Sequence, residues 1–170
     1  IDDSRESTQR VERLIGPRTA RLAQHRLDLL IECAAAITGA ADEHALAEAA
    51  LKSALAGGGF DRAALLRPRI GHDDVEVLGY QCRDNSTPAA VTFSRSLLRE
   101  AASGQLVRLA TQSHVVSGGS IAELGITAAV CAPIMLSNSI AAYLYLDARG
   151  TQREVAADAA AFCQVIARLC

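Results

Sequence analysis

The stretch ITAAVCAPIMLSNSIAAYLYLDARG, residues 126–150, decides the fold of this chain. Two apolar runs flank a short polar break at residues 137–139, which is the pattern of a β-hairpin. Side chains alternate between the two faces of a strand, so the second run has one face with Tyr143, Tyr145 and Asp147, and an opposite face with Ala142, Leu144 and Leu146. The stretch has no nucleophile beside a general base. It therefore predicts the wall of a sheet rather than an active site.

The composition indicates one globular domain with a full core. The chain has 170 residues, of which 50% are hydrophobic and 21% are charged. A formal net charge of -2 and an aromatic content of 4% argue against binding to nucleic acid or to an anionic membrane. The sequence contains neither an apolar run of about 20 residues nor a signal-peptide pattern, so we expect no membrane partner and a cytoplasmic location.

The cysteines are scattered and form no C-x-x-C pair, which argues against a disulfide framework or a zinc site. We expect buried thiols at the three that lie in apolar runs, Cys33, Cys131 and Cys163. The consecutive residues 72–74, His-Asp-Asp, are typical of a turn and cannot converge on one ion. The sequence thus predicts no metal.

Residues 1–16 are polar and predict a linker from an upstream domain, and the domain itself is predicted over 17–170. The ends of the sequence suggest an excerpt of a longer protein. Helical periodicity and capping residues predict helices over 17–38, 42–55, 94–103 and 153–170. Gly57-Gly58-Gly59 follows a helix and precedes a strand, which predicts a C-cap and turn instead of a phosphate loop. Further strands are predicted over 62–67, 75–81 and 105–110.

Short connections make neighbouring strands antiparallel, and helices at the chain ends cover one face of the resulting sheet. The irregular segments 83–104 and 111–125 then lie on the other face, where they would form a pocket. The predicted fold class is α/β of the α+β type. It has a central antiparallel sheet of five or six strands, terminal helices on one face, and loops and short helices on the other.

Three stretches carry a resemblance to a known family: FSRSLLREAASGQLVRL (93–109), SIAELGITAAVCAPI (120–134) and AYLYLD (142–147). In order and spacing they resemble the GAF family of sensory and regulatory domains, over about residues 25–169. The nearest resemblance is to bacterial modules found beside forkhead-associated, cyclase, diguanylate cyclase or sigma-54 activator domains. The resemblance implies a ligand pocket or a dimer-forming signal transmitter in a larger signalling protein, without selecting a ligand.

The sequence does not identify a cofactor, but its departures from the family pattern argue against two kinds of ligand. The Asn-Lys…Asp-Glu signature of cyclic-nucleotide-binding members is missing from the region before the last helix, which argues against a cyclic nucleotide. Residues 83–125 contain no cysteine, so we expect no covalent bilin. Ala142 stands where the family usually has glycine.

The ligand-binding prediction follows from the strand faces and from the segments over them. The polar candidate is His114, for which an exposed loop histidine remains the alternative. The full predicted set is Tyr80, Phe93, Ser94, Leu97, Leu98, His114, Ile121 and Leu124.

A homodimer is predicted because both terminal helices have apolar stripes. The last helix repeats apolar residues at 4-3-4-3 spacing, and the first helix has a second stripe. The alternative is that these stripes face the chain's own core. The predicted interface comprises Leu22, Leu29, Val155, Ala159, Phe162, Ile166 and Leu169.

Three functions are weighed. The first is a sensory module that binds a small molecule and transmits through dimerising terminal helices. The second is a structural dimeriser whose vestigial pocket is filled by Leu97, Leu98, Ile121 and Leu124. The third, and the weakest, is a cysteine-based reductase of free methionine sulfoxide that uses Cys82 and Cys131. We expect no enzyme.

Overall fold

The structure, a computed structural model, describes residues 17–69, 71, 74–86, 88, 90–109, 121, 123–150 and 157–170, with side chains from residue 23 onward except that of Ala157. The helices are α2 (Pro17–Thr38), α3 (Glu43–Gly58), α4 (Arg95–Ala101) and α6 (Ala157–Leu169). The strands are β1 (Arg62–Pro68), β2 (Val75–Cys82), β3 (Val107–Leu109), β4 (Ile126–Leu136) and β5 (Ser139–Arg149). In this part of the chain, no helix is long and apolar enough to cross a membrane.

The strands form one five-stranded antiparallel sheet in the order β2-β1-β5-β4-β3. The stretch at 126–150 supplies β4 and β5, joined by the two-residue turn Ser137-Asn138, and Leu136 pairs with Ser139 across it. Ser137, and not Asn138, takes the positive φ, at 57°. The predicted antiparallel sheet is confirmed, with β5 at its centre.

Pro133 lies in β4 where the strand has one neighbouring strand among the described residues, β5. β3 pairs with residues 129–131 of β4, so its short length leaves the outer edge at Pro133 open. Pro133 pairs with Tyr143 of β5, and a register shift follows between Ile134 and Met135. A residue without an N–H is tolerated at such an edge.

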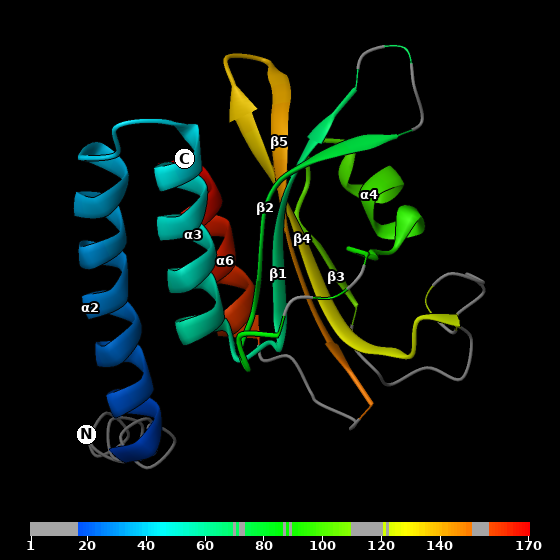
Figure 1. The fold of residues 1–170 in the computed structure, drawn as a ribbon. Helices are drawn as coiled ribbons and strands as arrows, with labels where there is room; N and C mark the ends of the chain where they lie inside the picture. The colour runs from blue at the N-terminus through cyan, green and yellow to red at the C-terminus, as the bar shows by residue number, and fades with distance from the viewer. Residues whose placement is uncertain are drawn as a thin grey trace, which may run out of the picture.

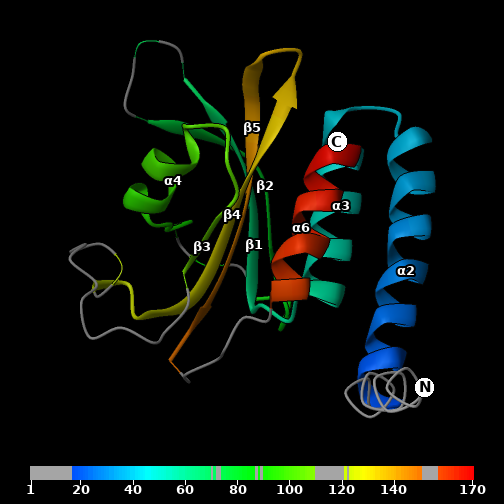
Figure 2. The same ribbon diagram turned by 180° about the vertical axis from the view of Figure 1, so that it is seen from behind.

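The terminal helices and α3 lie on one side of the sheet, and α4 lies on the other (Figures 1 and 2). α3 and α6 pack directly on the strands, while α2 forms an outer layer against α3 and α6. Arg26 fastens this layer, because its Nε donates to the Gly57 carbonyl oxygen at 2.9 Å and its guanidinium pairs with Asp158. The predicted arrangement of helices on one face is therefore confirmed.

The glycine run 57–59 has two functions. Gly59 ends α3 in a left-handed conformation with φ 77°, which confirms the predicted C-cap. Gly57 and Gly58 belong to the helix itself. A Cβ on Gly57 would overlap the Phe162 ring, and one on Gly58 would lie 3.2 Å from Cys163 Sγ. The missing side chains therefore let α6 approach α3 closely.

The apolar stripe of α6 lies in the core of the single chain. Ala159, Phe162 and Ile166 are at most 4% exposed and pack with α3 and the sheet. They are therefore not free to form the predicted dimer surface, because their apolar area is already buried within one chain. Leu29 is half-buried against the same core, whereas Leu169 is 36% exposed. Val155 and the side chain of Leu22 lie outside the described residues.

Candidate functional site

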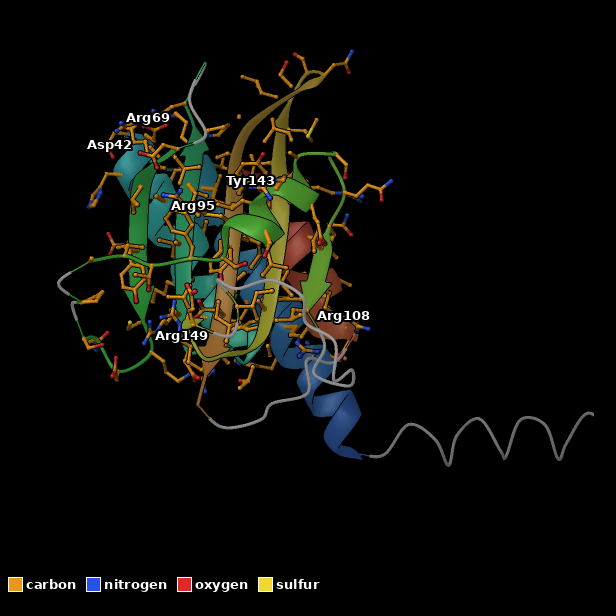
Figure 3. The ribbon with its side chains drawn as sticks, turned by 90° about the vertical axis from the view of Figure 1, so that its right-hand side faces the viewer. Asp42, Arg69, Arg95, Arg108, Tyr143 and Arg149 are labelled. Carbon is orange, nitrogen blue, oxygen red and sulfur yellow. The ribbon has the colours of Figure 1, made fainter. Side chains whose placement is uncertain are left out.

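The face of the sheet opposite the three large helices carries a second apolar cluster, covered by α4 (Figure 3). Tyr143 and Tyr145 of β5 lie in it, whereas Leu144 and Leu146 belong to the cluster under the helices. The alternation read from the sequence is thus confirmed. The cluster also brings together six of the predicted pocket residues, namely Tyr80, Phe93, Leu97, Leu98, Ile121 and Leu124.

The middle of the predicted pocket is filled by the chain's own side chains. Leu97, Leu98 and Ile121 are each no more than 8% exposed and pack on the sheet. Tyr80, Phe93 and Leu124 are half-buried around them. His114 lies outside the described residues, so its assignment stays a prediction. Any ligand space among the described residues must therefore lie beside this filled centre.

Ser94 connects α4 to the sheet. Its hydroxyl caps α4 by accepting from the Leu97 backbone N–H at 3.4 Å, and its own N–H donates to the Tyr145 hydroxyl at 3.2 Å. The Tyr145 hydroxyl in turn donates to Asp147 Oδ2 at 3.2 Å. Burial, followed by the charge of Asp147, raises the pKa of Tyr145 well above its usual range, so the phenol stays a hydrogen-bond donor. The start of α4 is thus positioned by β5.

Asp147 is a buried charge, 1% exposed, at the end of this chain of hydrogen bonds. Arg149 neutralises it, because its Nη2 donates to Asp147 Oδ2 at 3.0 Å. The same Nη2 lies 2.8 Å from the Thr92 carbonyl oxygen, two residues before the cap of α4. Asp147 Oδ1 has no hydrogen-bond partner among the described residues. The network therefore ties both β5 and the segment before α4 to one buried ion pair.

A cavity of about 320 Å³ lies on this face between α4, the turn end of the β1–β2 hairpin, and β5. Tyr143 is 6% exposed, and burial raises the pKa of its phenol. Figure 3 shows Arg95 and Tyr143 near the same end of the sheet, with Arg149 toward the other end. The cavity is lined by Pro68, Asp74, Val75, Phe93, Arg95, Leu98, Arg99, Ala102 and Tyr143.

A second hollow, of about 270 Å³, lies at the Arg149 end of the sheet. Cys82 lies beside it, with its Sγ 2.9 Å from the Tyr80 hydroxyl. Burial, and then the contact with Cys82, raises the pKa of Tyr80 to about 12. The hollow is lined by Asp61, Arg62, Cys82, Arg83, Asp84, Ser86 and Arg149.

The thiol pair that the reductase hypothesis needs is not assembled. Cys82 is on β2 and Cys131 is on β4, with β1 and β5 between them. Three strand spacings separate the two by about 14 Å, whereas a disulfide needs Cα atoms within about 7 Å. Burial raises the pKa of Cys131 to about 12, which disfavours its thiolate. Among the described residues, no three His, Cys, Asp or Glu side chains gather into a metal-binding group, so we assign no metal ligands.

Sequence reasoning missed the charged residues of this face, above all Arg95, Arg99 and Arg149. The spacing of the first two could have been noticed, because arginines four residues apart in a helix lie on the same face. In α4 this face differs from the one with Leu97, Leu98 and Ala101, which packs on the sheet. Arg149 gave no such signal, because its partners come from β5 and from the segment before α4.

No family model matches the chain, and no curated protein matches it. Solved structures do match, at low sequence identity. The chromophore-binding domain of a Stigmatella aurantiaca phytochrome is 14% identical, with a TM-score of 0.67 over 84% of this chain and 57% of that chain. The GAF domain of a Coxiella burnetii phosphoenolpyruvate-protein phosphotransferase is 14% identical, with a TM-score of 0.66 over 86% and 90%. That of a protein assigned as a sensor histidine kinase in Pseudomonas syringae pv. tomato is 14% identical, with a TM-score of 0.59 over 89% and 86%.

These neighbours overturn one prediction. The exclusion of a covalent bilin is wrong, since chromophore-binding domains of phytochromes share this fold. The exclusion depended on the lack of a cysteine within 83–125. The structure places Cys82 and Cys131 outside it, on strands that form this same face of the sheet.

Proposed function

Because this chain has the fold of a GAF domain, we propose that residues 17–170 act as the sensory domain of a larger cytoplasmic signalling protein. In this proposal the domain binds a small molecule and is not an enzyme. Residues 1–16 would connect it to an upstream domain.

The observation that carries the proposal is the cavity of about 320 Å³ beside α4. It lies within the size range of small-molecule sites and combines an apolar floor with a few polar groups. Phe93 and Leu98, both predicted as ligand-binding residues, line it.

A path for the signal leads from this cavity to the helices. Ligand contacts on α4 would act on Ser94, which is hydrogen-bonded to Tyr145 of β5. On the other face of β5, Leu144 and Leu146 pack in the cluster that includes α6 residues. A shift of α4 would therefore reach α6 through a single strand.

The proposal includes a homodimer, but its interface is formed by exposed residues of α2 and α6 and not by the buried stripe of α6. Leu27 and Ile31 of α2 are 51% and 63% exposed, and Val165 and Leu169 of α6 are 39% and 36% exposed. Large exposed apolar side chains on two adjacent helices are typical of a contact surface. We propose that a second copy of the chain covers them.

The structural dimeriser remains the second candidate, because Leu97, Leu98 and Ile121 fill the centre of the predicted pocket. Native mass spectrometry of freshly purified protein separates the two functions, since a sensory domain is expected to retain a ligand mass and a dimeriser only the dimer mass. The variant Ala102→Trp, at the cavity wall, should abolish ligand retention, while Ser103→Trp, exposed and outside the lining, should preserve it. A wild-type protein that never carries or binds a small molecule would contradict the sensory proposal.

A further inference from the structure

The chemistry of the α4 cavity restricts what enters it. We propose that its ligand is an organic anion, with a planar apolar body and one carboxylate or phosphate group. This inference rests on the proposed ligand-binding function and adds the chemical class of the ligand.

The positive charge comes from Arg95 and Arg99, one turn apart on α4. Both line the cavity, and neither forms a salt bridge or side-chain hydrogen bond with any described residue. Two like charges at this spacing destabilise a helix, and an anion between them would reverse that effect. Guanidinium groups bind carboxylate and phosphate in a bidentate manner, so a pair of them is suited to one such group.

Among the lining residues that the structure describes, one is acidic, and it does not cancel this charge. Asp74 is exposed, and its Oδ1 accepts from the N–H of Val75, the next residue. Among the described residues of the lining, two arginines and one aspartate give a net charge of +1. The cavity therefore favours an anion over a neutral or cationic ligand.

The rest of the lining suits a flat apolar body. Phe93 and Tyr143 supply two aromatic rings, and Val75 and Leu98 supply aliphatic surface. The Tyr143 hydroxyl makes no hydrogen bond to the described residues, and its pKa is raised, so it is available as a donor to the ligand. Aromatic rings favour offset or edge contacts with another flat ring system.

The test uses three probes of one shape, 2-naphthoate, 2-naphthyl phosphate and neutral 2-naphthamide. The chain has no tryptophan, so naphthalene fluorescence reports binding with little overlap from the protein. We expect at least one anionic probe to bind about tenfold tighter than naphthamide, because charge-assisted hydrogen bonds are about twice as strong as neutral ones. If 2-naphthoate binds more tightly than 2-naphthyl phosphate, the ligand carries a carboxylate; the reverse order indicates a phosphate.

The double variant Arg95→Gln/Arg99→Gln should remove this preference and leave naphthamide binding within about twofold of wild type. Both positions are exposed, and an unchanged thermal melt checks that the variant folds. The matched control is Arg168→Gln, an exposed arginine on α6 outside the cavity lining, which should keep the preference.

Equal affinity for naphthoate, naphthyl phosphate and naphthamide would overturn the anion inference and leave the sensory proposal standing. An anion preference that survives in the double variant would likewise overturn it, because the charge would then lie elsewhere. Failure of all three probes, together with no retained ligand by mass spectrometry, would overturn the sensory proposal as well.

Discussion

At the scale of single residues, Asp147 is a buried carboxylate on the candidate face. A carboxylate that is 1% exposed remains charged only if other groups compensate its lost hydration. Arg149 and the Tyr145 hydroxyl provide that compensation, both at Oδ2. Asp147 therefore links the stability of the sheet to the position of α4.

Replacing this carboxylate by an amide tests the link. We expect Asp147→Asn to lower the free energy of unfolding by about 1.5–3 kcal/mol, because hydrogen bonds to charged groups contribute that much and Arg149 would lose its anionic partner. Urea unfolding followed by circular dichroism measures the change. The control, Asp84→Asn, removes an exposed carboxylate and should stay within about 0.5 kcal/mol of wild type. Similar losses in the two variants would show that Asp147 has no special role.

Gly57 is a second position where one atom decides the packing. Gly57→Ala should cost about 1–3 kcal/mol, since the added methyl group would overlap the Phe162 ring in a filled core. Gly39→Ala is the control, because its new methyl would meet only ordinary contacts, the nearest at 3.4 Å. The double variant Gly57→Ala/Phe162→Leu should recover part of the loss if overlap is its cause. Urea unfolding measures the stability of all three variants. An unchanged urea midpoint for Gly57→Ala would be inconsistent with close packing of α3 and α6.

At the scale of elements, α4 is the short helix on which the candidate site depends. Seven residues are too few for a helix to be stable in isolation, so its position depends on packing and on its cap. Leu97, Leu98 and Ala101 provide the packing, and Ser94 provides the cap.

Removal of the cap should therefore loosen α4 more than the rest of the domain. Ser94→Ala should cost about 1 kcal/mol, and backbone amides of residues 95–101 should exchange with deuterium faster, while amides of β5 should change less. Hydrogen exchange followed by NMR measures the exchange rates of the amides in α4 and in β5. Ser103→Ala is the control, because within the described part of the chain its hydroxyl donates to the Glu100 carbonyl oxygen alone. Uniformly faster exchange throughout the sheet would mean that Ser94 supports the whole fold and not α4 alone.

At the scale of the whole molecule, the packing of the helices decides which apolar side chains are buried and which are exposed. Phe162 faces inward at 4% exposure, whereas Leu27 and Ile31 face outward on α2. The apolar stripes in the sequence look alike, but only the outward residues are available to a second chain.

This difference gives the prediction on assembly. Light scattering of the wild type should give a dimer mass, and Leu27→Glu/Ile31→Glu should give a folded monomer, because both charges would be placed in the proposed interface. Phe162→Glu should instead unfold the domain, since it buries an unpaired charge. A wild type that stays monomeric at high concentration would exclude dimerisation by this chain itself. A monomeric, folded Phe162→Glu would place that stripe on the surface.

The sequence by itself determined the described strands and large helices and the side of the sheet on which those helices lie. Strict alternation in residues 140–147 assigned Tyr143, Tyr145 and Asp147 to one face of β5, because a strand has a period of two residues. Short turns made the sheet antiparallel, and the motifs at 93–109, 120–134 and 142–147 indicated the fold.

Tertiary structure alone decided which apolar stripe is core and where the cavity lies. Helical periodicity marks a stripe without telling whether the same chain or a second one covers it, so Phe162 and Ile166 were assigned to a dimer although α3 and the sheet bury them. The cavity depends on how far Leu97, Leu98 and Ile121 fill the space beneath α4, which is a matter of side-chain volumes from distant segments. The pairing of Asp147 with Arg149, and of Arg149 with Thr92, likewise exists only once β5 and the segment before α4 meet.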